Sequence, residues 1–178
     1  RQIKDIENLV NEFSSFARMP SPIFRKIEID LIVNRAVNFY KMSSKTIINL
    51  SVNDKKKIIN GDEEQLYRVF INLIKNSEDS IAEKKEKNAL FIGKINIEID
   101  ENKDYINILL ADNGLGIADT SKIMTPYYTT KKDGTGLGLP IVSKIINEHK
   151  GEITISNNKP GARVLLIFPK LIKWKKKF

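Results

Sequence analysis

The chain has 178 residues, of which 41% are hydrophobic, and a formal net charge of +8, which suits one large domain or a domain with an appendage. It has no cysteine and one histidine, which excludes disulfides, thiolate metal sites and histidine-rich metal sites. No apolar run approaches the ~18 residues of a membrane span, so we expect membrane contact only through segments outside this sequence.

Residues 1–17 predict a helix, because apolar side chains recur at steps of three and four positions. A single apolar stripe on such a helix needs a partner to cover it. Pro20 and Pro22 end the helix. We therefore expect a helical segment at 1–22, a larger domain at 23–170 and a basic tail at 171–178. No folded nucleic-acid-binding motif accompanies the basic residues, so we expect no nucleic-acid partner.

The domain at 23–170 alternates between strand and helix patterns. Asp30 is suited to cap its first helix, and Gly151 follows its last helix as a C-terminal cap. The expected strands are 25–30, 46–52, 56–60, 93–100, 104–112, 152–157 and 162–169. The expected helices are one that follows Asp30, one at 61–85 and one at 137–150. Residues 113–136 have no clear period and predict a long loop of the kind that forms active-site lids.

The long helix at 61–85 has two faces of different character. One is an apolar stripe suited to the core, made of Leu66, Val69, Phe70, Leu73, Ile74, Ser77 and Ile81. On another face, Asn72, Asn76 and Asp79 recur at helical spacing. Asparagine is unfavourable inside a helix, so these amides are either solvated or form a ligand face for a hard cation such as Mg2+.

The stretch "ADNGLGI" ends the strand at 104–112 with a carboxylate, Asp112, followed by Gly114 and Gly116. An Asp-Asn-Gly run is also a common turn. As a site, a carboxylate at a strand end can accept a hydrogen bond from a purine amine, while glycines let a ligand approach the backbone.

The stretch "KKDGTGLGLP", residues 131–140, places Gly134, Gly136 and Gly138 at alternate positions before a helix. Its spacing matches neither a Walker loop nor a dinucleotide fingerprint. It could be the hinge of a mobile loop. It could equally bind phosphate, because a helix N-terminus offers free N–H groups and Lys131 and Lys132 add positive charge.

The order of these stretches is more specific than any one of them. "LYRVFINLIKNSEDSI", "DNGLGI", "MTPYYTTK" and "GTGLGLPIVSKIINEHKGEI" resemble the N-box, first glycine box, aromatic box and second glycine box of sensor histidine kinases. These belong to the superfamily that also holds gyrase, Hsp90 and MutL. The opening "DIENLVNEFSSFARMPSP" resembles the second helix of the dimerisation and phosphoacceptor domain. Its FARMP motif resembles that of sensor kinases of the nitrogen-regulation type.

The resemblance implies an α+β fold, a two-layer sandwich with a mixed sheet under helices, that binds ATP and Mg2+. It implies that Asn76 coordinates Mg2+, that Asn72 lies near the phosphates and that Asp112 recognises adenine. It implies that Lys131 contacts phosphate. The remaining nucleotide-binding positions implied are Gly114, Gly116, Thr135, Gly136, Leu137 and Gly138.

Two departures from relatives bear on the chemistry. Asn72 stands where the superfamily's ATPases carry a water-activating Glu, so efficient ATP hydrolysis is not expected. Ser80 stands where many sister kinases place an aromatic that stacks on adenine.

His149 matches a scaffold position, so no phosphoacceptor is expected within the chain, and autophosphorylation of this chain is not expected either.

The resemblance also implies partners and a location. The phosphoryl group would pass to a histidine on an upstream dimerisation helix and then to the receiver domain of a response regulator. The full-length protein would be a homodimer that acts in the cytoplasm, and the resemblance allows an anchor in the inner membrane, as full-length relatives often have. Two alternatives remain: a serine kinase of the anti-sigma type, which would be expected to keep the Glu, and a non-catalytic ATP-binding scaffold.

Overall fold

The computed structural model describes residues 19–53, 56–131 and 134–171. The predicted helix at 1–17 and nearly all of the tail lie outside these residues. In chain order the elements are β1 (Arg25–Glu28), α2 (Ile29–Lys41), β2 (Ile47–Val52), β3 (Ile58–Gly61), α3 (Glu63–Lys87), β4 (Lys94–Glu101), β5 (Tyr105–Asp112), α4 (Gly138–Glu148), β6 (Glu152–Asn158) and β7 (Gly161–Pro169). Each predicted strand and helix within the described residues is therefore present, with small shifts of its ends.

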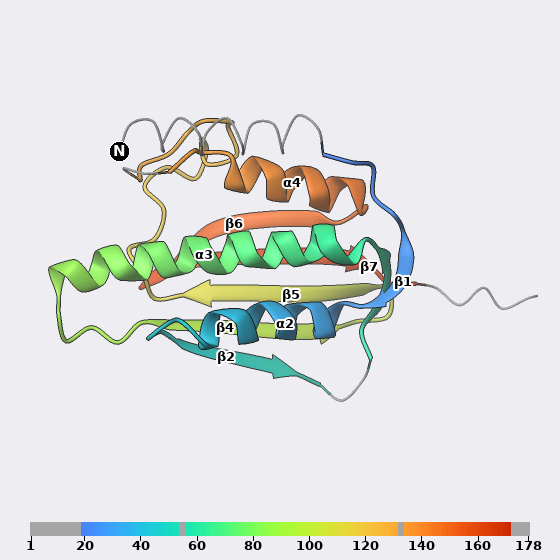
Figure 1. The fold of residues 1–178 in the computed structure, drawn as a ribbon, viewed down its shortest axis with the longest axis horizontal. Coiled ribbons are helices and arrows are strands. Elements are labelled where there is room, and N and C mark those ends of the chain that lie inside the picture. Colours follow the sequence, from blue (N-terminus) through green and yellow to red (C-terminus); the bar gives the residue numbers. More distant parts are fainter. Residues whose placement is uncertain (1–18, 54–55, 132–133, 172–178) are drawn as a thin grey trace, which may run out of the picture.

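Five strands form one mixed sheet in the order β2-β4-β5-β7-β6, and β1 pairs with β3 in a separate two-stranded ribbon. β2 runs parallel to β4, whereas the β4–β5, β5–β7 and β6–β7 pairs are antiparallel. The three helices α2, α3 and α4 lie together on one face of the large sheet (Figure 1). The fold is the two-layer α/β sandwich that the sequence predicted.

Alternating side chains fix which face of the sheet meets the helices. On β4, Ile95, Ile97 and Ile99 are buried, while the residues between them are exposed. On β5, which pairs with β4, Ile106, Ile108 and Leu110 are buried. Because strand side chains alternate with a period of two, a slip of one residue would turn these side chains to the open face. The pattern therefore fixes the register, in which Ile97 faces Leu110.

The long helix α3 has signals at both ends. Asp62 is its N-cap, and the side chain accepts a hydrogen bond from the Gln65 N–H at 3.0 Å. Acidic residues occupy the first turn and lysines the last turn, which suits the helix dipole. The predicted core stripe is confirmed, since all of its members are buried, namely Leu66, Val69, Phe70, Leu73, Ile74, Ser77 and Ile81. The face that carries the two asparagines is consequently turned away from the core.

The prediction that Asp30 caps α2 is wrong. The helix begins at Ile29, directly after β1, and its N-cap is Glu28, whose side chain makes no capping hydrogen bond. Asp30 lies in the first turn and accepts from the Lys57 N–H at 3.3 Å. The Ile29 N–H donates to the Lys57 carbonyl at 2.9 Å. The backbone at Lys57, which is distant in sequence, thus forms hydrogen bonds at the start of α2 in place of a local cap.

The C-terminal cap of α4 is also one residue away from the prediction. Lys150, with φ of 57°, takes the left-handed position that Gly151 was expected to hold. The Lys150 N–H donates to the Asn147 carbonyl and the Gly151 N–H to the Ile146 carbonyl, which is a Schellman motif. A Cβ on Gly151 would lie 2.9 Å from the Ile167 carbonyl oxygen, so glycine is required there by close approach to β7.

None of the helices in the described part of the chain combines the length and apolar character that a membrane crossing requires.

His149 joins three parts of the fold. Its side chain is 3% exposed, and Nε2 accepts from the Asp62 N–H at 2.9 Å. Nδ1 lies 2.8 Å from the Ile145 carbonyl oxygen, and the Phe24 ring packs against the imidazole at 5.2 Å. Nε2 must be unprotonated to accept from Asp62, and burial lowers the pKa of His149 below its usual value. The fold therefore requires the neutral imidazole.

We expect the free energy of unfolding to fall as the pH drops below about 6.5, the usual histidine pKa, because the unfolded chain then binds a proton that the folded chain resists. Above that pH the contribution is fully present. The substitution His149→Gln retains an acceptor for Asp62 and removes the titrating group. Urea unfolding between pH 5 and 8 should show this slope in the wild type and a weaker one in the variant; equal slopes would contradict the assignment.

Candidate functional site

A cavity of about 800 Å³ opens between α3, the end of β5, the loop after β5 and the start of α4. This volume lies in the range of small-molecule sites. The predicted site residues that line the cavity are Asn72, Asn76, Asp112, Gly116, Lys131, Thr135, Gly136 and Gly138. Gly114 and Leu137, also predicted, are not among the lining residues, and Leu137 is fully buried in the core. The fold thus brings together stretches of chain that are far apart in sequence.

Asp112 stands at one end of the cavity, where β5 ends. It is 7% exposed, and both of its carboxylate oxygens have partners. Oδ1 accepts from the backbone N–H of Gly114 at 2.9 Å and of Ala162 at 3.2 Å, and Oδ2 accepts from the Ser77 hydroxyl at 3.0 Å. A carboxylate offers about four acceptor positions, so Oδ2 retains capacity for a donor from a ligand.

Glycine is required at positions 114 and 116, after Asp112, for different structural reasons. A Cβ on Gly114 would lie 2.4 Å from the Ser80 hydroxyl, so Gly114 lets the loop approach α3 rather than a ligand. Gly116 has φ of 80°, a conformation that favours glycine, and it lines the cavity. The sequence predicted both glycines at the nucleotide site, and only Gly116 lines the cavity.

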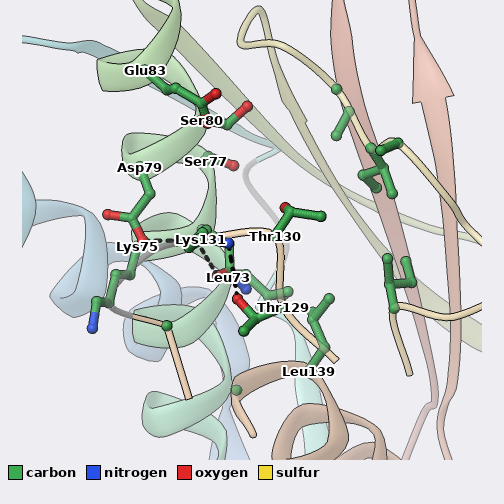
Figure 2. A pocket seen from close by; sticks show the side chains of 18 of the residues that line it. Leu73, Lys75, Ser77, Asp79, Ser80, Glu83, Thr129, Thr130, Lys131 and Leu139 are labelled. Carbon is green, nitrogen blue, oxygen red and sulfur yellow. Dashed lines mark hydrogen bonds and ion pairs between the residues drawn. The ribbon is translucent and has the colours of Figure 1, made fainter. Parts of the chain in front are cut away.

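The other end of the cavity holds the asparagine face of α3. The Lys131 ammonium donates to Asn76 Oδ1 at 2.9 Å and to Asp79 Oδ2 at 2.7 Å. Figure 2 shows this side chain reaching from the loop to Asp79 on α3. Two oxygens of the helix thus converge on one positive charge. Among the described residues there is no cluster of three or more His, Cys, Asp or Glu that could hold a metal by itself.

A tyrosine of α2 lies behind this end of the cavity. The Tyr40 hydroxyl donates to the Ile71 carbonyl at 3.4 Å. Burial and the nearby carboxylates of Asp79 and Glu78 raise the pKa of Tyr40 to about 12. The phenol stays neutral at physiological pH and adds no charge beside Asp79.

Asn72 lies on α3, one turn before Asn76, and beside the start of α4. Its Nδ2 donates to the Arg68 carbonyl of its own helix at 2.9 Å. Its Oδ1 lies 3.3 Å from where a Cβ on Gly138 would be. Asn72 therefore directs its amide oxygen to the first residue of α4, and glycine at 138 leaves room between the two helices.

The start of α4 forms a further wall. The N-cap residue Leu137 contributes no side-chain hydrogen bond, and Gly138 and Leu139 of the first turn line the cavity. The Thr135 hydroxyl accepts from the Leu137 N–H at 3.4 Å. Gly136 has φ of 69°, and a Cβ there would lie 2.5 Å from the Tyr127 carbonyl carbon. These features leave the N–H groups of the first turn beside the cavity, where an anion is favourable. Lys132 lies outside the described residues.

Several residues of the site were not predicted from the sequence. Ser77 was expected only in the core stripe, yet its hydroxyl contacts Asp112. Ser80 accepts from the Leu115 N–H at 2.9 Å and so positions the loop. Apolar side chains line the cavity between its two ends, namely Ile117, Ile123, Tyr128, Leu139, Ile155 and Val164. The one sequence signal that could have indicated the Ser77–Asp112 contact was the serine at position 77, on the helix face nearest Asp112.

Asn157 of β6 holds the start of the long loop. Its Oδ1 accepts from the Ile117 N–H at 2.7 Å, and its Nδ2 donates to the Ile117 carbonyl at 2.8 Å. The amide thus pairs with both backbone groups of one loop residue, as a neighbouring strand would. A Cβ on Gly116 would lie 2.8 Å from the same Oδ1, so this contact also requires glycine.

Comparison with protein families gives a match over residues 61–172 to "Histidine kinase-, DNA gyrase B-, and HSP90-like ATPase". The matched residues run from the end of β3 to beyond β7 and include every cavity wall described above.

Curated relatives include proteins named as sensor histidine kinases or as nitrogen regulation proteins. The chain is 34% identical over 168 residues to the "Putative sensor histidine kinase NtrY-like" of Rickettsia conorii, covering 93% of this chain and 27% of that protein. It is 31% identical over 163 residues to the "Nitrogen regulation protein NtrY" of Azorhizobium caulinodans, covering 90% and 21%. The chain thus spans about a quarter of the length of these relatives.

Among solved structures, a nucleotide-free catalytic domain of histidine kinase ThkA superposes with a TM-score of 0.72 at 25% identity, covering 83% of this chain and 96% of that one.

We expect Asn157→Ala to raise the hydrogen-exchange rate of the Ile117 amide by roughly thirtyfold, because two hydrogen bonds of about 1 kcal/mol each are lost. Amide exchange followed by NMR measures the effect. Asn158→Ala, the same change at the next and also exposed position, is the matched control and should leave Ile117 unaffected. An unchanged exchange rate in Asn157→Ala would show that Asn157 does not hold the start of the loop.

Proposed function

Because the chain belongs to the histidine kinase-, DNA gyrase B- and HSP90-like ATPase family, we propose that it is the catalytic part of a sensor histidine kinase, which binds Mg-ATP and donates the γ-phosphoryl group to a histidine. The observation that carries the proposal is one cavity with a buried carboxylate at one end and a cation held by α3 at the other. A nucleotide has a base with amine donors at one end and a charged phosphate chain at the other, in the same order.

The base end of the cavity suits adenine. Asp112 Oδ2 accepts from Ser77 and can accept from an exocyclic amine as well, whereas the carbonyl that guanine carries at this position would meet a carboxylate. With Ser80 committed to the Leu115 N–H, the flat faces of the base would lie against aliphatic side chains such as Ile155 and Leu139 rather than an aromatic ring.

The phosphate end of the cavity suits Mg2+. Asn76 and Asp79 already direct oxygens at one cation, the Lys131 ammonium, and amide and carboxylate oxygens are ligands that Mg2+ accepts. Asn76 would hold the ion, which supplies neutralisation of the phosphate charge. Lys131 and the N–H groups at the start of α4 would bind phosphate oxygens.

The residue one turn before Asn76 favours transfer to a protein over hydrolysis. Asn72 carries an amide, which cannot take a proton from water at neutral pH, and its Nδ2 donates to the Arg68 carbonyl. Phosphoryl transfer otherwise depends mainly on positioning and charge neutralisation, which this cavity provides.

The acceptor histidine would come from another segment. The one histidine of the chain, His149, is 3% exposed, and both ring nitrogens are engaged by Asp62 and Ile145. From the acceptor, the phosphoryl group would pass to an aspartate of a response-regulator receiver domain, and the whole kinase would act as a homodimer. The chain itself would act in the cytoplasm.

We expect Asn76→Ala to raise the Kd for ATP in Mg2+ by roughly tenfold or more, the effect of losing about one metal ligand, and to leave the Kd in EDTA near that of the wild type. Isothermal titration calorimetry in both buffers measures this. Asn38→Ala, on the exposed face of α2, is the control. Equal Mg2+ dependence in Asn76→Ala and wild type would show that Asn76 is not the ligand, and no binding of ATP up to millimolar concentration would overturn the proposed function.

We expect the chain alone to show no phosphorylation by γ-labelled ATP, and a separate dimeric fragment that carries the histidine helix of the same kinase to become labelled when the chain is added. The reason is that the chain offers an ATP site and no accessible histidine. A fragment with His→Ala at the acceptor is the control. Labelling of the chain alone, or of the control, would contradict the assignment of the acceptor.

A further inference from the structure

Lys84 departs from the usual solvated lysine. Its side chain, near the end of α3, donates to the Asn113 carbonyl at 2.6 Å, the Gly114 carbonyl at 2.8 Å and the Pro160 carbonyl at 3.3 Å. An ammonium has three donors, so these carbonyls use its full capacity. The charge also lies 4.7 Å from the centre of the Phe91 ring, at a distance where cation–π attraction operates.

The carbonyls that Lys84 binds belong to the two segments that hold Asp112. Asn113 and Gly114 follow Asp112 directly, and the Gly114 N–H donates to its Oδ1. Pro160 lies in the turn between β6 and β7, just before Ala162, whose N–H donates to the same oxygen. One ammonium therefore fixes the distance between both backbone donors of the carboxylate.

The surroundings leave the loop little freedom to find another position. Ser80, one helical turn before Lys84, accepts from the Leu115 N–H at 2.9 Å (the serine is labelled in Figure 2). A Cβ on Gly161 would lie 2.2 Å from the Asp112 carbonyl oxygen, so the turn and the end of β5 are in close contact. Without the ammonium, the carbonyls of Asn113 and Gly114 would lose the donor that they share.

We infer that Lys84 is a positioning residue for nucleobase recognition: its ammonium bridges the loop after β5 and the β6–β7 turn and thereby sets the place and direction of the Asp112 carboxylate. The inference rests on the proposed function, in which Asp112 accepts from adenine. Lys84 is not among the residues that line the cavity, so it acts through Asp112 and its neighbours rather than by touching the ligand. The phosphate end, built from Asn76 and Lys131, has no contact with this bridge in the hydrogen bonds described.

The test compares three ligands, each with Mg2+: ATP, GTP and inorganic triphosphate, which lacks a base. The variant Lys84→Met retains the aliphatic stem against Phe91 and removes the ammonium. We expect its Kd for ATP to rise roughly tenfold and its preference for ATP over GTP to shrink by about the same factor, the effect of one misplaced hydrogen-bond acceptor. The Kd for inorganic triphosphate should stay within about twofold of the wild type, because the phosphate end is unchanged.

Controls separate the bridge from general loss of structure. Lys85→Met makes the same change at the next, exposed position of α3 and should leave all three constants at their wild-type values. Lys84→Arg supplies several donors and should recover part of the ATP preference. If Lys84→Met does not fold, Lys84→Gln, which retains one amide donor, takes its place and must also lower the preference for ATP.

Three results would overturn the inference. These are wild-type discrimination between ATP and GTP in a folded Lys84→Met or Lys84→Gln variant, a parallel loss of ATP and triphosphate binding, and a similar effect of Lys85→Met. Failure of the proposed function is distinguishable from all three, because the wild-type chain itself would then bind no ATP or show no preference over GTP.

Discussion

The arrangement of the site depends on how one buried carboxylate is satisfied. A carboxyl group that is 7% exposed is costly unless hydrogen bonds replace its water, and Asp112 obtains them from a serine of α3, the loop after β5 and the start of β7. These segments can supply the bonds only if α3 crosses the end of β5 and β7 pairs beside it. The contacts that make the charge tolerable therefore also determine the layer order of the fold at this point.

The helix α3 serves the core and the cavity at once. Its apolar stripe is buried against the sheet and α2, while Asn72, Asn76 and Asp79 face the cavity. Because side chains three and four positions apart lie on one face, a polar face of this kind extends along the helix from the start of α4 toward the loop. The low helix propensity of asparagine is a cost of roughly half a kcal/mol per residue, which packing of the opposite face offsets.

Sequence reasoning succeeded where the signal was local and periodic. The strands alternate and the stripe of α3 repeats, and these patterns correctly place Asp112 at a strand end and Asn76 on the second face of the helix. It failed where the partner lies far along the chain: Lys57 takes the role expected of a local cap at Asp30, and the contacts of Lys84 and Asn157 span 29 and 40 residues. A lysine among other lysines and an asparagine at a strand end carry no periodic signal, so only the fold reveals that they hold the loop.

The two ends of the cavity are held by interactions of different strength. At the base end, the carboxylate and the loop are held by many hydrogen bonds that involve backbone donors, Ser77, Ser80, Lys84 and Asn157, and the bonds from Ser77 and Gly114 to Asp112 are buried. At the phosphate end, the loop meets α3 through Lys131, which donates to Asn76 and pairs with Asp79, and the side chains of that ion pair are 36% and 40% exposed. An ion pair with that exposure contributes about 0–1 kcal/mol. Separating the loop from α3 at the phosphate end breaks fewer hydrogen bonds than disturbing Asp112 does, so a nucleotide would meet a prepared base site and an adjustable phosphate site.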